Sequence, residues 1–309
     1  ARNLAVSDDG RYLMVANYLP HTLVLLDAEE LRPVKLIDVH DDSGKSSRVS
    51  AVYTADPRHS FIAALKDIRE VWEINYQKYP PRGFGEWMHD YRLESGENQA
   101  VKQFPVRRIR VKDYLDDFMF SQDYVTLIGA SRDGHGQVVD LDLGRVTHEL
   151  DLPGMPHMAS GITWEYQGRT VMVTPNLKKA AVSVIDMETW ETIKEIPTQG
   201  PGFFMRSHEN TNYAWVDVFF GPHKDKVHVI DKRTLEIVRT LQPAQGKTAA
   251  HVEFDRDGRH ALLSIWDQDG AVVVYDAATL EEQKRLPMVK PSGKYNVHNK
   301  ITRSAGTSH

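Results

Sequence analysis

One strand pattern recurs six times along the chain, and this repetition limits the possible folds more than any other feature. Each copy is an apolar run that ends in Asp or Asn and leads through a short polar link to another run. The six runs end at Asp27, Asn75, Asp140, Asp186, Asp231 and Asp276. The last three intervals are 46, 45 and 45 residues. A period of ~40–50 residues with short strands is typical of a β-propeller with one four-stranded blade per copy.

The first copy shows how each blade is built. Apolar alternation predicts strands over residues 3–7, 12–17, 22–27 and 34–39, with a tight turn at Asp9-Gly10. We therefore predict an all-β chain, a β-propeller with about six blades present. A β-sandwich is the alternative, and the constant spacing of the last four copies argues against it.

The period is interrupted once. Asp140 follows Asn75 by 65 residues, so about 20 residues are inserted within the segment 76–106. Pro80, Pro81 and two glycines predict a loop there, either a plain surface insertion or a lid.

Composition excludes several classes of protein. The chain of 309 residues has a net charge of −5 with both signs interspersed, which disfavours nucleic-acid binding. It has no apolar stretch long enough to span a membrane. It has no Cys, which excludes disulfides, thiol nucleophiles and covalent c-type haem within this chain. Because it opens at Ala1 inside a predicted strand, we interpret it as a mature or truncated piece.

Propeller topology predicts which loops share a face. In antiparallel blades, the loop from second to third strand and the link to the next blade emerge together. Those segments contain arginines, histidines and large aromatic residues: Arg2, Tyr18, Arg48, His157, Asn176, Phe203, Phe204, His251 and Trp266. The set suits a flat aromatic ligand with carboxylates, stacked on Tyr or Trp and paired with Arg. A His there could ligate iron or act as acid or base.

Each of these residues also has a structural interpretation. A loop His is often a hydrogen-bonded structural residue, Trp266 could cap the core, and Arg2 and Arg48 could be solvated charges. The recurrent Asp residues are expected to bond turn amides. Eight further histidines are expected in turns or on exposed strand positions, without a role: His40, His59, His89, His135, His148, His223, His228 and His260.

The repeats, the tail KPSGKYNVHN at 290–299 and the links around His157 and His251 resemble the haem d1 domain of the cytochrome cd1 nitrite reductase family. Segments 10–39, 45–66 and 306–309 are most similar to the dihydro-haem d1 dehydrogenases of that superfamily. The resemblance implies an eight-bladed propeller preceded by a c-type cytochrome domain. It thus implies that two blades, that domain and the proximal iron ligand lie outside this chain, and that the protein is periplasmic.

Departures from the nitrite reductases are informative. Those enzymes have two histidines over the haem; one aligns with Asp116 and the other with His157. They have no His where His251 stands, and Phe where Tyr295 stands. The resemblance therefore implies oxidation of a propionate of dihydro-haem d1 to the acrylate of haem d1, rather than nitrite reduction.

In that reaction electrons would pass to a c-type haem or c-type cytochrome outside this chain, with nitrite reductase as recipient of haem d1. His157 is the implied iron ligand, and His251 and Tyr295 are the implied catalytic pair. The implied ligand contacts are Arg2, Tyr18, Arg48, Asn176, Phe204, Trp266 and Lys294. Nitrite reduction, a non-catalytic haem d1 carrier or assembly role, and a protein-binding propeller remain alternatives.

Overall fold

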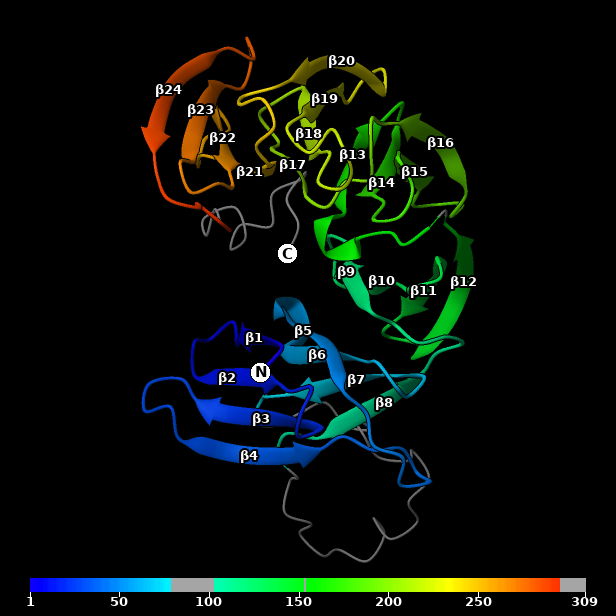
Figure 1. Cartoon of the computed structure of the whole chain (residues 1–309). Helices are drawn as coiled ribbons and strands as arrows, with labels where there is room; N and C mark the ends of the chain where they lie inside the picture. The colour runs from blue at the N-terminus through cyan, green and yellow to red at the C-terminus, as the bar shows by residue number, and fades with distance from the viewer. Residues whose placement is uncertain (79–102, 153, 295–309) are drawn as a thin grey trace, which may run out of the picture. The chain divides into compact units, whose positions relative to one another are not determined.

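The computed structural model describes residues 1–78, 103–152 and 154–294. Within these ranges the chain forms six four-stranded antiparallel sheets and no α-helix (Figure 1). No helix in the described part is long and apolar enough to cross a membrane. Each sheet corresponds to one predicted repeat, so the fold is that of a β-propeller with about six blades, as the sequence predicts.

The chain divides into two compact units, residues 1–131 with 137–149, and residues 132–136 with 150–309. The strands of the first three blades are β1 (Asn3–Val6), β2 (Tyr12–Ala16), β3 (Thr22–Asp27), β4 (Pro33–Asp38), β5 (Val49–Ala55), β6 (Ser60–Leu65), β7 (Glu70–Asn75), β8 (Val106–Arg110), β9 (Asp117–Phe120), β10 (Thr126–Ala130), β11 (His135–Asp140) and β12 (Arg145–Asp151). They belong mainly to the first unit.

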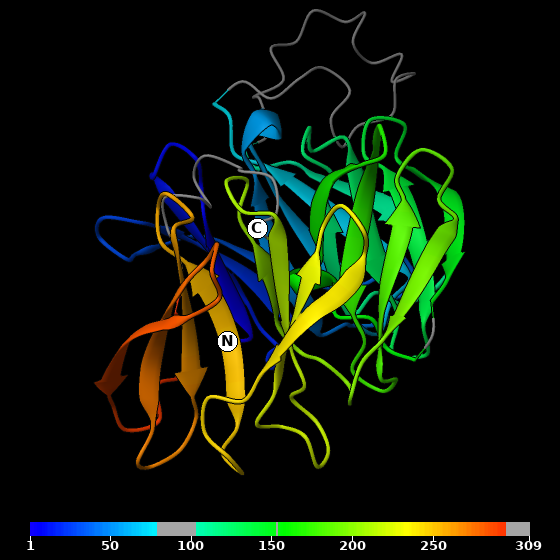
Figure 2. The same ribbon diagram turned by 90° about the horizontal axis from the view of Figure 1, so that it is seen from above.

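The second unit holds the other three blades, whose twisted sheets are also visible from above in Figure 2. Their strands are β13 (Ile162–Tyr166), β14 (Arg169–Pro175), β15 (Ala181–Asp186), β16 (Thr192–Pro197), β17 (Met205–Ser207), β18 (Tyr213–Asp217), β19 (Val227–Asp231), β20 (Glu236–Leu241), β21 (Ala249–Phe254), β22 (His260–Ile265), β23 (Ala271–Asp276) and β24 (Glu282–Pro287).

The six marker residues all close the third strand of a blade. In the four clear copies the Asp carboxylate accepts hydrogen bonds from backbone N–H groups of the following turn, as at Asp27 and Asp276. Its backbone carbonyl accepts one from a left-handed residue that ends the turn. These turn-ending residues are Leu31, Trp190, Leu235 and Leu280, with φ between 54° and 63°. The repeated motif is therefore a turn-forming device, which confirms the structural interpretation of these Asp residues.

Apolar residues of neighbouring blades pack together. In the first unit Met14, Leu25 and Trp72 belong to one buried cluster that joins the first two sheets. In the second unit Trp215 and Phe254 belong to another that joins the last two. Since no helix covers these sheets in the described residues, blade-to-blade packing supplies the core.

The first blade also presents an apolar face that is not buried. On the side opposite Met14, cross-strand register brings together Leu4, Val6, Leu13, Val15, Val24, Leu26 and Leu36. Leu4, Val6 and Leu36 are 56%, 53% and 62% exposed. An apolar sheet face of this kind normally packs against another layer.

The insertion lies inside the second blade, between β7 and β8, and residues 79–102 lie outside the described ranges. The chain leaves β7 at Asn75 and re-enters β8 at Val106, at the end of the sheet opposite the β6–β7 loop. That end is the one where turns, not the predicted ligand-facing loops, emerge. The position therefore favours a surface insertion over a lid.

Two sequence-based expectations about histidines are wrong. His251 does not lie in the link before the last blade but within β21, at a bulge where the register shifts between Ala250 and Glu253. His228 is not in a turn or on an exposed position; it lies in β19 and is 1% exposed. Because β19 is buried on both of its faces, side chains that point to either face are buried, and the ring of His228 is one of them.

Candidate functional site

Most of the residues predicted to lie on the ligand-facing loops fall into two clusters, one in each unit. In the first unit the phenol ring of Tyr18, in the β2–β3 loop, is surrounded by cations. Arg2, Arg48 and Lys66 lie 5.8, 5.7 and 6.0 Å from its centroid. We call these four residues the cation cluster. Cation–π attraction orients the charged groups beside the ring.

Neighbouring carboxylates hold two of these cations. The guanidinium of Arg48 donates from Nε and Nη2 to Asp67, at 2.9 and 2.6 Å. These hydrogen bonds are the main reason that the pKa of Asp67 falls to about 2. Lys66 is paired with Asp116. Arg48 is thus preorganised, and part of its hydrogen-bonding capacity is already in use.

In the second unit aromatic rings surround the two candidate histidines. We call His157, Phe203, Phe204, Phe219, His251 and Trp266 the histidine–aromatic cluster. Phe204 lies 4.4 Å from Phe203, 4.5 Å from His251 and 6.1 Å from Trp266, between ring centroids. Phe219 lies 5.4 Å from Trp266. The cluster gives an apolar surface with two imidazoles in it.

His157 is held in one tautomer. It lies in the β12–β13 link, and its ring stacks on Phe203 at 4.3 Å and 21°. Its Nδ1 is 2.5 Å from the carbonyl oxygen of Phe203. A carbonyl only accepts, so Nδ1 carries the proton and Nε2 carries the lone pair. A metal-binding histidine commonly has this arrangement, with the other nitrogen donating to a backbone carbonyl.

His251 is buried, 2% exposed, and adopts φ 57°. A left-handed backbone is uncommon outside Gly and Asn, and a bulge redirects the side chain that it carries. The amide of His251 donates to Asp217, at 3.4 Å, and its carbonyl accepts from the ammonium of Lys294. Both backbone polar groups of the bulge are thereby satisfied by side chains.

Lys294 and Asn176 have supporting positions. The Lys294 ammonium also donates to Ser264 Oγ at 2.8 Å, and burial lowers its pKa to about 7. Asn176 is 1% exposed, and its Oδ1 accepts from the Met155 amide, in the link that carries His157. Tyr295, predicted as the catalytic partner of His251, lies outside the described residues.

Trp266 and Phe203 lie in the loops assigned to them. Trp266 is half-buried, and its Nε1 has no hydrogen-bond partner among the residues that the structure describes. Sequence reasoning missed Lys66, Phe219 and Asp217. Lys66 follows β6 directly, as Trp266 follows β22. The assignment of loops between the second and third strands to the ligand-facing side, which identified Trp266, could therefore have identified Lys66. Asp217 gave no signal because its partners are backbone amides of distant segments.

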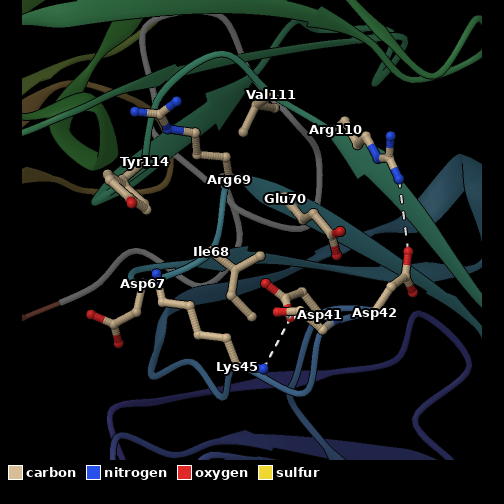
Figure 3. A pocket seen from close by; sticks show the side chains of 11 residues that line it. Asp41, Asp42, Lys45, Asp67, Ile68, Arg69, Glu70, Arg110, Val111 and Tyr114 are labelled. Carbon is tan, nitrogen blue, oxygen red and sulfur yellow. Dashed lines mark hydrogen bonds and ion pairs between the residues drawn. The ribbon is translucent and has the colours of Figure 1, made fainter.

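A hollow of about 610 Å³ lies in the first unit, and Asp67, the partner of Arg48, is one of the residues that line it (Figure 3). Acidic and basic side chains alternate around it. Asp41 accepts from the backbone amides of Ser43 and Lys45, at 2.9 and 3.0 Å, and Asp42 pairs with Arg110 at 3.7 Å. No group of metal-binding side chains occurs in the described ranges. These carboxylates shape a loop, and the hollow carries no assignable ligand chemistry.

Six four-stranded blades, with a cation cluster in the first unit and a histidine–aromatic cluster in the second, define a protein of the β-propeller class. Residues 1–300 match the cytochrome D1 heme domain. The chain belongs to the cytochrome D1 heme domain family.

Comparison with individual proteins agrees. The chain is 55% identical to dihydro-heme d1 dehydrogenase of Pseudomonas aeruginosa, over 309 residues that cover all of this chain and 58% of that protein. It is 29% identical to protein NirF of Stutzerimonas stutzeri, over 94% of this chain and 70% of NirF. It superposes on the solved structure of dihydro-heme d1 dehydrogenase NirN in complex with DHE, with a TM-score of 0.87 and 54% identity. That match covers 97% of this chain and 60% of the solved one. The chain thus spans less than two thirds of these dehydrogenases.

Proposed function

We propose that this chain is the substrate-binding propeller of a dihydro-haem d1 dehydrogenase. In the proposed reaction a propionate side chain loses two hydrogens, as two protons and two electrons, and becomes an acrylate. The observation that carries the proposal is the pair of imidazoles, His157 and His251, held on one aromatic cluster in a chain 55% identical to such an enzyme.

His157 is the proposed ligand of the substrate's iron. The hydrogen bond from Nδ1 to Phe203 leaves the lone pair on Nε2, the form in which imidazole binds a metal. Stacking on Phe203 restricts rotation of the ring. The residues present therefore fit an iron tetrapyrrole.

The cation cluster is the proposed site for peripheral carboxylates. Arg2 supplies charge, Arg48 and Lys66 are held by Asp67 and Asp116, and Tyr18 offers an aromatic face for the macrocycle. The proposed contacts from the second unit are Phe204 and Trp266, whose rings belong to the histidine–aromatic cluster. Asn176 and Lys294 support the neighbouring backbone.

His251 and Tyr295 are the proposed groups that remove protons from the propionate. An alkyl C–H is a very weak acid, so an imidazole alone is a poor base for it. The macrocycle supplies most of the activation by withdrawing electrons. His251 contributes a proton acceptor at a fixed position, away from bulk water.

We further propose that the complete protein has two more blades and a c-type cytochrome domain that accepts the electrons. The exposed apolar face of the first blade supports further blades, since Leu4, Val6 and Leu36 are left for another sheet to cover. A periplasmic location, a c-type cytochrome as electron acceptor and nitrite reductase as recipient of haem d1 belong to the same proposal.

The test is anaerobic incubation of the protein with dihydro-haem d1 and two equivalents of a one-electron acceptor, ferric c-type cytochrome. Mass spectrometry should show loss of two hydrogens from the tetrapyrrole, and the cytochrome should become reduced. A His251→Gln variant should bind the substrate and oxidise it more slowly. Binding without any oxidation by the full-length protein would instead indicate a carrier.

A further inference from the structure

We propose that Asp217 is a positioning residue that fixes the backbone of both segments carrying the candidate histidines. Its carboxylate binds the backbone amide of His251 and reaches His157 indirectly, through the backbone of Phe203. Only the catalytic consequence of this inference rests on the proposed function; the geometric part stands without it.

Asp217 is the last residue of β18 and is fully buried. Its Oδ1 accepts from the amides of Phe203 and Phe204, at 2.7 and 3.1 Å, and its Oδ2 from the amide of His251, at 3.4 Å. Burial raises the pKa of Asp217 to about 7, although the three N–H donors act in the opposite direction. A buried carboxylate is costly unless it is well paired, and this one is paired with three backbone amides.

The connection to His157 runs through the backbone of Phe203. Asp217 binds the N–H of Phe203, while the carbonyl of the same residue accepts the Nδ1 proton of His157. The Phe203 ring also stacks on the imidazole. A shift of the 203–204 backbone would therefore move the acceptor that sets the tautomer of His157.

The connection to His251 is direct. Its left-handed backbone costs about 1 kcal/mol for a residue with a Cβ, so surrounding contacts must hold it. Asp217 accepts a hydrogen bond from the N–H of His251, and Lys294 donates one to its carbonyl. The two side chains act on opposite ends of one residue and direct its imidazole toward Phe204.

Asp217→Asn preserves the volume and removes one of the two acceptor oxygens. The first test uses protein without tetrapyrrole, labelled with ¹⁵N-histidine, and records ring-nitrogen resonances by NMR. The variant should shift the signals of both His157 and His251. The matched control is Asp231→Asn, since Asp231 lies at the opposite end of the same sheet and accepts from the Arg233 amide. The control should shift neither signal.

Lys294→Met provides a second variant if Asp217→Asn does not fold. It removes the hydrogen bonds to the His251 carbonyl and to Ser264 Oγ and leaves the contacts of Asp217 in place, so it should shift His251 and leave His157 unchanged. Wild-type resonances for both histidines in Asp217→Asn, or equal shifts in the Asp231→Asn control, would overturn the proposal. So would an unshifted His251 in Lys294→Met.

The second test adds dihydro-haem d1 and ferric c-type cytochrome. Asp217→Asn should oxidise bound substrate at least about tenfold more slowly, because misplaced catalytic groups lose rate steeply. Its Kd should stay within about threefold of wild type, since most binding contacts persist. A rate equal to that of wild type would remove the catalytic consequence. If the wild-type protein oxidises no dihydro-haem d1, the proposed function fails, while the NMR test still decides the positioning role.

Discussion

Lys66 and Asp116 form an ion pair whose side chains are only 10% and 12% exposed. Asp116 stands where the resemblance to nitrite reductases places a histidine. In this chain that position holds the partner of a lysine that lies beside Tyr18.

The pair predicts an asymmetric effect on stability. Asp116→Asn leaves the ammonium of Lys66 with its main charge partner removed, and should lower the free energy of unfolding by about 3 kcal/mol. The double variant Lys66→Met/Asp116→Leu should lie closer to wild type, because neither residue then buries a charge. Urea unfolding followed by fluorescence measures both. An equal decrease in the free energy of unfolding for the single and the double variant would contradict a stabilising role for the Lys66–Asp116 pairing.

His228 predicts a loss of stability in acid. Its Nε2 accepts from the amide of Gln199 at 3.1 Å, so Nδ1 carries the proton and donates to Thr240 Oγ1 at 2.8 Å. Burial lowers its pKa to about 4. A folded-state pKa below the unfolded one gives stability that is present above about pH 6.5 and lost as the pH falls through 4, by about 3 kcal/mol.

The measurement is the free energy of unfolding between pH 7 and pH 4 for wild type, His228→Gln and His148→Gln. Wild type and the control at exposed His148 should lose stability in parallel. His228→Gln should be less stable at pH 7 but lose less on acidification. Identical slopes for all three proteins would contradict the assignment.

The repeated turn predicts opposite effects of glycine at equivalent positions. Leu31 and Leu235 both end the turn with positive φ, 54° and 58°, but Leu31 is 62% exposed and Leu235 is 1% exposed. Leu31→Gly should stabilise by up to about 1 kcal/mol, because it relieves the left-handed backbone. Leu235→Gly should destabilise by about 2 kcal/mol or more through lost burial. Thermal or urea unfolding compares them, and destabilisation of similar size at both sites would contradict this account.

The apolar face of the first blade predicts self-association. With Leu4, Val6 and Leu36 exposed, the 309-residue chain should form concentration-dependent oligomers in sedimentation velocity runs. A Val6→Lys/Leu36→Lys variant should be monomeric over the same range. Lysines that replace two other exposed residues, Leu143 in the β11–β12 turn and Val238 in β20, serve as the control. Unchanged association in the first variant would place the interface elsewhere.

The strand order was predictable because it is repeated locally. Apolar alternation and the recurrent Asp or Asn identify the third strand of each blade. The six marked segments therefore predict the six sheets. The position of His251 was not predictable, since a bulge adds one residue without changing the apolar pattern around it. The burial of His228 was also not predictable. In the sequence a polar residue within a strand is interpreted as exposed, and only the structure shows that Gln199 and Thr240 supply hydrogen-bond partners for a buried ring.

The candidate site was predictable only in part. Loop assignment placed Arg2, Tyr18, Arg48, His157, Phe204 and Trp266 on one shared face, without dividing them into groups. Within the first unit the structure groups Arg2, Tyr18 and Arg48, and within the second unit it groups His157, Phe204 and Trp266. The carboxylates that hold these groups were not visible. Asp67 is distant in sequence from Arg48, and Asp217 acts on backbone amides that any residue possesses.

The most direct measurement is an anaerobic absorption titration of the protein with dihydro-haem d1, in wild type, His157→Ala and the control His148→Ala. Wild type and His148→Ala should give the same saturable spectral change with a change in iron ligation. His157→Ala should lose that ligation signature and bind at least about tenfold more weakly. Identical spectra and affinities for all three proteins would contradict the assignment of His157, and no saturable change in wild type would contradict tetrapyrrole binding itself.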